Sequence, residues 1–235
     1  MLVLYVRLSI LYKDLSYKYM NDIALFWIQW SGKWTQATKI LAEYPKYFTY
    51  EPWELIRALS KVNWEIGSFF AGNKTGAMLD NATTCAMFDM YTTILAPDQQ
   101  MLMDGFPRNF TQMYHVLANA RKTRRTLIGI YLDLNKNIAI QRLLNRYYIK
   151  KEGHLYPILA SEVDAQKATW AEIVHREDDN IESITKRIDL YFADTMPVVR
   201  HFEDQWLLYR VDADQPINDV YNDIKKIIET TRTWN

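Results

Sequence analysis

The chain has 235 residues, enough for one core with inserted lobes or for two small domains. Its 28 lysines and arginines balance 28 aspartates and glutamates, so the formal net charge is zero. The charge therefore does not indicate a nucleic acid or an anionic membrane as a partner. A single cysteine, Cys85, excludes an internal disulfide framework and a four-cysteine zinc site, which is typical of a reducing cytoplasm.

The N-terminal segment is the first stretch that needs an interpretation. Residues 1–12 are apolar but too short to span a bilayer, and they lack the basic start and cleavage site of a secretory signal. Met20 stands just before the first clear strand pattern. Residues 1–19 are therefore either an extension that does not belong to the true protein or an amphipathic N-terminal arm.

Short apolar runs then alternate with amphipathic helical patterns. A buried strand at Ile23–Ile28 is followed by a loop and a helix from about Lys33 to Ala42. Three further buried strands are predicted at Met101–Asp104, Leu127–Tyr131 and Leu207–Val211. This alternation predicts an α/β fold with a mostly parallel sheet flanked by helices, and ligands of such sheets gather at the carboxyl ends of the strands.

Two stretches do not fit the layered pattern. Residues 50–79 look helical and polar, whereas residues 147–180 look charged and loop-like, and both are candidates for lobes inserted into the core. The helix expected at Ile181–His201 carries an apolar stripe, which indicates ordinary packing against the core.

The loop after the first strand carries the most information about chemistry. A loop between a buried strand and a helix that ends in Gly32-Lys33 offers backbone amides, a helix N-terminus and a lysine charge to phosphate oxygens. However, bulky indoles at Trp27, Trp30 and Trp34 occupy turns where amides must approach a phosphate closely. With glycine at those three positions the segment would be a complete phosphate-binding loop.

The composition supports that substitution. Average glycine usage of about 7% predicts roughly 16 glycines in a chain of this length. The sequence has 7 glycines and 8 tryptophans, which together nearly reach that number. Our hypothesis is that the codon UGA means glycine in the source of the gene and was translated as tryptophan. A protein that is truly rich in tryptophan is the alternative.

Several motifs resemble the adenylate kinase family over nearly the whole chain from Met20 onward. Residues 27–36 resemble its Gly-x-x-Gly-x-Gly-Lys-Gly-Thr-Gln string except at the three tryptophans. Residues 104–108 resemble Asp-Gly-Phe-Pro-Arg, with Gln112 four residues further on. Residues 51–57 are similar to Ser-Thr-Gly-Asp-x-x-Arg, with tryptophan again at the glycine.

The resemblance extends to the segment that covers the nucleotides in that family. The pair Arg142 and Arg146 resembles the arginines that open the lid, and residues 169–172 and 176–180 resemble the segments that close it. Residues 153–156 resemble the strand of zinc-free lids, so no zinc is expected. Tryptophan also stands at two further glycine positions, Trp170 and Trp206, whereas Trp64 and Trp234 stand where glycine is not required.

The resemblance implies a P-loop kinase fold over residues 20–235, with a nucleoside monophosphate (NMP)-binding lobe at about 50–79 and a lid at about 147–180. It implies a cytoplasmic monomer that transfers a phosphoryl group reversibly from ATP to AMP, giving two ADP, with Mg²⁺ bound alongside ATP.

The implied catalytic residues are Lys33, Arg108, Arg142, Arg176 and Arg187. The implied ATP-binding residues are Trp27, Trp30, Ser31, Gly32, Lys33, Trp34, Thr35, Gln36, Arg142 and Arg146. The implied AMP-binding residues are Trp53, Arg57, Gly105, Arg108, Gln112, Arg176 and Arg187. Asp104 would contact the waters of magnesium, and Tyr156, Asp178 and Asp179 would belong to the lid.

The arginines make physical sense together, because planar guanidinium groups hold and neutralise phosphate oxygens in pairs. The attacking phosphate oxygen is already anionic, so the reaction needs positioning and charge stabilisation rather than a general base.

The choice of base rests on Gln112, since a carboxamide can pair with an adenine edge. Kinases of UMP and CMP tend to carry asparagine there, and Glu51 and Pro52 depart from the family pattern. A UMP or CMP kinase therefore stays open as an alternative. A catalytically silent binding protein of the same fold is the other, if the tryptophans are real.

Overall fold

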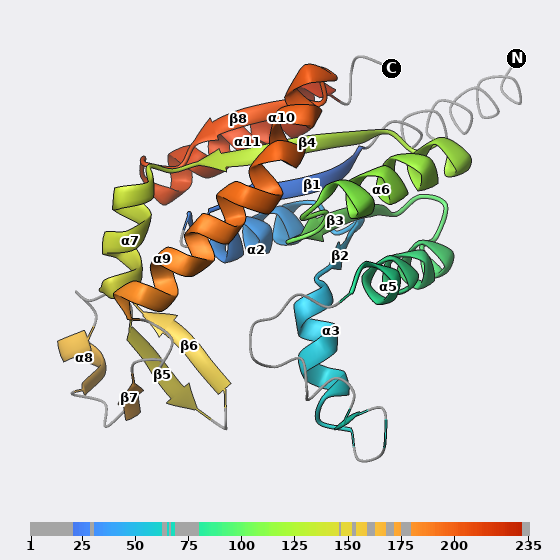
Figure 1. The fold of residues 1–235 in the computed structure, drawn as a ribbon. Coiled ribbons are helices and arrows are strands. Elements are labelled where there is room, and N and C mark those ends of the chain that lie inside the picture. The colour runs from blue at the N-terminus through green and yellow to red at the C-terminus, as the bar shows by residue number, and fades with distance from the viewer. Residues whose placement is uncertain are drawn as a thin grey trace, which may run out of the picture.

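The computed structural model describes residues 21–28, 31–62, 65, 67–68, 80–145, 147–151, 154–158, 163–167, 172–174 and 180–231. Five parallel strands form its central sheet in the order β2-β3-β1-β4-β8 (Figure 1). Their bounds are β1 (Asp22–Trp27), β2 (Tyr47–Tyr50), β3 (Gln100–Asp104), β4 (Leu127–Asp133) and β8 (Leu208–Asp212). The predicted α/β fold is confirmed, and the four predicted strands are present within two residues at each end, but β8 is not buried as predicted, because it is an edge strand in which only Val211 is buried.

Helices cover both faces of this sheet. The described helices are α2 (Lys33–Glu43), α3 (Pro52–Leu59), α5 (Asn81–Ile94), α6 (Phe110–Thr123), α7 (Lys136–Leu144), α8 (Val163–Lys167), α9 (Ile181–Leu190), α10 (Met196–Asp204) and α11 (Ile217–Thr231). Helix α2 packs against α11, while α10 packs against β4, β8 and α6. None of the described helices is both long enough and apolar enough to cross a bilayer.

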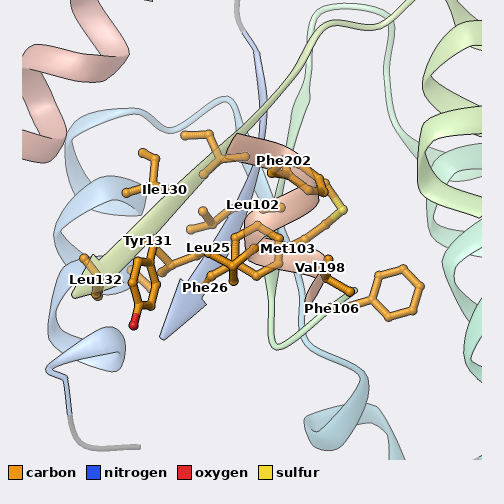
Figure 2. Packing of buried hydrophobic residues seen from close by; sticks show 14 of the residues in the cluster. Leu25, Phe26, Leu102, Met103, Phe106, Ile130, Tyr131, Leu132, Val198 and Phe202 are labelled. Carbon is orange, nitrogen blue, oxygen red and sulfur yellow. The ribbon is translucent and has the colours of Figure 1, made fainter. Parts of the chain in front are cut away.

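The core joins the three central strands to α10. Every residue of β3 is buried, and the first five residues of β1 are buried as well. Figure 2 shows Phe26 of β1 beside Phe202 of α10, whose ring centroids are 5.1 Å apart in an edge-to-face arrangement. Because these side chains interlock at close packing, the carboxyl ends of β1 and β3 are held at one fixed edge of the sheet.

The opposite edge of the sheet is fixed by a buried ion pair. Both carboxylate oxygens of Asp22, at the start of β1, accept hydrogen bonds from Arg125, at 2.5 and 2.6 Å. The backbone N–H of Met101 donates to the same carboxylate at 2.7 Å. This network joins the starts of β1 and β3 to the segment before β4, far along the strands from their carboxyl ends.

Four of the described helices begin at a residue whose side chain caps the first turn. Asp80, Asn109, Asn135 and Asn180 each accept a backbone N–H of the first turn of the helix that follows, as expected of these cap residues. Helix α2 instead begins after Gly32 without a side-chain cap among the described residues. Its first N–H groups are therefore available to an anion.

Residues 147–180 differ from the loop expected there. Their described parts form an antiparallel sheet of β5 (Tyr147–Lys151), β6 (His154–Ile158) and β7 (Glu172–Val174), in the order β6-β5-β7. Lys150 pairs with Glu172 across two strands at 3.1 Å, so charged residues that indicated a loop are cross-strand partners. Figure 1 shows this sheet and α3 projecting from the body as two separate extensions.

The helix predicted at 181–201 is interrupted. Between α9 and α10 lies a π-helical turn, η2 (Tyr191–Thr195), in which the N–H of Met196 donates to the carbonyl of Tyr191. Pro197 has no N–H to donate to the carbonyl four residues earlier, and its ring crowds that carbonyl. The wide turn relieves this conflict, and such turns are frequent at functional sites.

Candidate active site

The site lies where β1 and β3 end and α2 begins. The strands are paired in parallel with Leu25 opposite Asp104, so the loop after β1 and the segment after β3 lie next to each other. Lys33, the first residue of α2, places its Nζ 2.6 Å from Oδ2 of Asp104 and 3.7 Å from Oε1 of Glu51. The predicted lysine and the predicted magnesium-side carboxylate are therefore direct partners.

Asp104 is an unusual carboxylate because it is only 3% exposed. Burial raises its pKa to about 6, the charge of Lys33 opposes that rise, and the carboxylate of Glu51 adds to it. Its other oxygen, Oδ1, is buried and accepts no hydrogen bond from the described residues, and the same holds for the hydroxyl of Ser31. Buried oxygens of this kind fit a hydrated cation and its phosphates.

Gly32 is required by its backbone rather than by crowding. Its φ is +85°, in the left-handed region, while an added Cβ would meet no atom within 4 Å. A side chain would be strained there whatever the space around it. Thr35 is half-buried in the same first turn of α2.

A pocket near the end of β3 is lined by residues from α3, α5, the segment after β3 and α6. They are Pro52, Trp53, Ile56, Thr84, Gly105, Phe106, Arg108 and Gln112. Four of these, Trp53, Gly105, Arg108 and Gln112, were predicted from the sequence to bind one nucleotide. The fold thus brings together residues that are 59 positions apart in the chain, between Trp53 and Gln112.

Arg108 is the cation of this pocket. Its Nε donates to the carbonyl of Gly105 at 2.8 Å, and its guanidinium carbon lies 5.7 Å from the centre of the Trp53 ring. Desolvation lowers the pKa of Arg108, and the charges of Asp104 and Glu51 oppose that change. A guanidinium with so little water around it favours a bound anion.

Comparison with known proteins decides the family. The adenylate kinase family model matches residues 29–207. The chain is 32% identical to an adenylate kinase of Nitrosococcus oceani over 212 residues, covering 86% of this chain and 95% of that protein. It is 26% identical to an adenylate kinase 2 of Schistosoma mansoni, with 89% of each chain covered, and 26% identical to an adenylate kinase of Streptococcus uberis, covering 85% and 94%.

The chain belongs to the adenylate kinase family. This confirms the enzyme class predicted from the sequence motifs, and it does not favour a UMP or CMP kinase or a silent binding protein.

Within this adenylate kinase, Gln112 ties the walls of the pocket together. It is 3% exposed, and its Oε1 accepts the backbone N–H of Arg108 at 2.8 Å. Its Nε2 donates to Asn81 Oδ1 at 3.1 Å and to Thr84 Oγ1 at 3.3 Å. Asn81 and Thr84 were not predicted from the sequence, because α5 carries no motif.

Three other predicted residues donate hydrogen bonds to residues outside the pocket. Gln36 donates to the carbonyl of Ile217 at 3.0 Å and so ties α2 to α11. Arg142 donates to Asp214 at 3.0 Å and to the carbonyl of Ala213 at 3.3 Å, while Arg187 donates to Ser183 within α9. Helices α7 and α9, which carry these two arginines, pack against each other.

Some predicted residues lie outside the described part of the chain. These are Trp30, Arg146, Trp170, Arg176, Asp178 and Asp179, together with the side chains of Arg57 and Tyr156. Arg57 itself belongs to α3, which borders the pocket.

The tryptophans fall into two groups. Trp206 has a φ of +59° in the turn before β8, and it is 92% exposed, which agrees with a glycine position. The backbones of Trp27, Trp34 and Trp53 are not left-handed, so the expected turn strain is absent there. At these three positions only the space taken by the indole bears on function.

Two of these indoles lie against the site's cations. The Trp27 ring centre is 4.6 Å from Nζ of Lys33, and the ring approaches Gly105 so closely that a Cβ there would lie 2.9 Å from it. The Trp53 ring lies against the guanidinium of Arg108 in the same way. The indole of Trp34 is 62% exposed and does not fill the site.

Proposed function

We propose that this site transfers the terminal phosphoryl group of ATP to AMP and forms two ADP. The observation that supports it best is the 2.6 Å ion pair between Lys33 and the buried Asp104, which lies four residues before the pocket cation Arg108 in the chain. Lys33 comes from the loop that faces a triphosphate in this family, and Arg108 comes from the pocket beside it. Two phosphate groups bound to them would meet next to Asp104.

The residues act by positioning and charge. Lys33 exchanges its contact with Asp104 for a contact with the β and γ phosphate oxygens of ATP. The same oxygens accept hydrogen bonds from the uncapped N–H groups of α2. Arg108, with Arg57, holds the AMP phosphate through paired hydrogen bonds. Arg142, Arg146, Arg176 and Arg187 surround the transferring group, where charge spreads over its oxygens.

The acceptor base is proposed to be adenine. The Gln112 carboxamide can accept from and donate to its edge once its bonds to Asn81 and Thr84 are exchanged. The apolar walls of the pocket, Pro52, Ile56 and Phe106, suit a flat ring.

Magnesium is proposed to accompany ATP, held by the nucleotide phosphates and, through water, by Asp104. The unpartnered Oδ1 of Asp104 fits this role. The ion would supply charge neutralisation between phosphate oxygens.

The two extensions of the fold are proposed to be mobile lobes. Residues 50–79 would form the NMP-binding lobe and residues 147–180 the lid that excludes water during transfer. We further propose a cytoplasmic monomer with a P-loop, whose domain spans residues 20–235.

The experiment compares the chain as printed with an eight-glycine version, in which all eight tryptophans are glycine. ADP formation is measured from ATP with AMP, UMP, CMP or dAMP as acceptor. We expect activity in the eight-glycine version, with AMP preferred, because Trp27 and Trp53 lie over the two cations of the printed chain. Preference for UMP or CMP would contradict the role of Gln112, and no activity with any acceptor in either version would contradict the proposed function.

A further inference from the structure

The π-helical turn η2 contacts the phosphate-binding arginine, and the proposed phosphoryl transfer does not use that contact. The hydroxyl of Thr195, the last residue of the turn, donates to the backbone carbonyl of Arg108 at 3.2 Å. Thr195 is 6% exposed, and this part-buried bond joins two elements that lie 87 residues apart in the chain. Any role of this bond in binding AMP rests on the proposed function, in which Arg108 holds the AMP phosphate.

The hydroxyl of Thr195 bonds to a residue outside its own helix. In an ordinary α-helix a threonine hydroxyl usually donates to the carbonyl four residues earlier, which for Thr195 is Tyr191. Here that carbonyl accepts the N–H of Met196, the i to i+5 bond that defines the turn. The hydroxyl of Thr195 is directed across to the Arg108 segment instead.

Arg108 is thereby held at three points. Its N–H donates to Gln112, its carbonyl accepts from Thr195, and its Nε donates to Gly105. With Nε committed to Gly105, the two terminal nitrogens are the donors that a phosphate would meet. A guanidinium reads a phosphate through two parallel bonds, so small errors in its direction weaken binding.

Tyr191, the first residue of the turn, bears on the charge around Arg108. Tyr191 is 9% exposed, and its hydroxyl has no hydrogen-bond partner among the described residues. Burial raises the pKa of Tyr191 well above its ordinary value, Tyr131 and Asp133 add to this rise, and Arg108 and Arg210 oppose it. The phenol therefore stays neutral and does not cancel the charge of Arg108.

We propose that Thr195 is a positioning residue for Arg108. Its hydroxyl fixes the backbone that carries the guanidinium, so that the two terminal nitrogens meet the phosphate of AMP. Loss of this hydroxyl weakens the binding of AMP and leaves the binding of ATP unchanged.

The test introduces Thr195→Val and Thr195→Ser, each separately, into the eight-glycine version of the whole chain, which is expected to form ADP. The KM values for AMP and ATP, kcat and the free energy of unfolding are measured for each. One buried hydrogen bond contributes about 0.5–1.5 kcal/mol, so Thr195→Val raises the KM for AMP roughly 3- to 10-fold while the KM for ATP stays within about twofold. Thr195→Ser keeps the hydroxyl and restores the KM for AMP.

Thr231 provides the matched control. It is also buried in a helix, at 8% exposure, and its hydroxyl donates to the carbonyl of Ile227 at 2.8 Å, within α11. Thr231→Val makes the same chemical change and leaves both KM values unchanged. If Thr231→Val raises the KM for AMP as much as Thr195→Val does, or if Thr195→Val raises both KM values equally, the positioning role is wrong.

Arg108→Ala separates this inference from the proposed function. We expect it to raise the KM for AMP strongly and to remove any further effect of Thr195→Val in the double variant. An unchanged KM for AMP in Arg108→Ala would overturn the assignment of Arg108, and the role of Thr195 with it. A raised KM in Arg108→Ala together with an unchanged one in Thr195→Val would overturn the role of Thr195 alone.

Discussion

Nζ of Lys33 lies 2.6 Å from Oδ2 of Asp104, although burial raises the pKa of that carboxyl to about 6. The cation that we propose to bind phosphate is thus paired with a carboxylate that is costly to ionise. In the proposed reaction, phosphates would take Lys33 away and Asp104 would contact the hydrated cation that comes with them, so each partner of the ion pair would exchange the other for a ligand.

This arrangement predicts a pH effect on stability in the absence of nucleotide. The pKa of Asp104 is higher in the folded chain than its ordinary value of 3.8, so the folded state binds more protons between about pH 4 and pH 6. The contribution of Asp104 to stability therefore falls as pH rises through that range. Asp104→Asn should gain stability relative to the parent by about 1–3 kcal/mol between pH 4 and pH 7, as measured by urea unfolding.

The control for this effect is an exposed carboxylate. The side chain of Asp164 is 99% exposed, so Asp164→Asn should show no comparable gain with pH. A difference between Asp104→Asn and the parent that stays constant from pH 4 to pH 7 would show that the carboxyl is not perturbed.

Two exposed tryptophans should respond to glycine in opposite ways. Trp206→Gly should stabilise the chain by about 1 kcal/mol, because φ at this position is +59° and the side chain makes little contact. Trp34→Gly should destabilise it by about 0.5–1 kcal/mol, because Trp34 lies in α2 with a helical backbone. Equal effects of both changes in urea unfolding would contradict the backbone argument.

Gln112→Leu should weaken the binding of AMP and leave the binding of ATP nearly unchanged. It removes the acceptor of the Arg108 N–H and the donor to Asn81 and Thr84, and it also removes the proposed contact with adenine. The KM for AMP should rise at least about tenfold, with the KM for ATP within about twofold. A parallel rise in both constants would indicate collapse of the pocket rather than loss of recognition.

Arg125→Met tests whether the far edge of the sheet is purely structural. It leaves the buried carboxylate of Asp22 without its charged partner, which should cost about 3–5 kcal/mol of unfolding free energy. At a temperature where the variant is folded, its KM values should equal those of the parent. Altered KM values in the folded variant would mean that this edge influences the nucleotide site.

Apolar periodicity predicted the sheet and α2 because β1, β3 and β4 are buried along nearly their whole length. It missed β2, which is only four residues long and has just two buried side chains, Tyr47 and Tyr50. The π-helical turn was also missed, since Tyr191 continues the apolar stripe of Ile184 and Ile188 that predicts a plain helix.

Motif spacing predicted three residues that the fold brings close together, namely Lys33, Asp104 and Arg108. The residues that contact this site from elsewhere could not be predicted, because Asn81, Thr84 and Thr195 reach it through hydrogen bonds between elements far apart in the chain. Such bonds depend on tertiary placement and leave no periodic or spaced signal in the sequence.

The central claim is that Lys33 and Arg108 form one phosphoryl-transfer site. The rate of ADP formation from ATP and AMP by the eight-glycine version, compared with its Lys33→Met and Arg108→Ala variants, tests it most directly. We predict that each variant loses on the order of 100- to 1,000-fold in rate while it remains folded. A folded Lys33→Met variant that forms ADP as fast as its parent would contradict the claim.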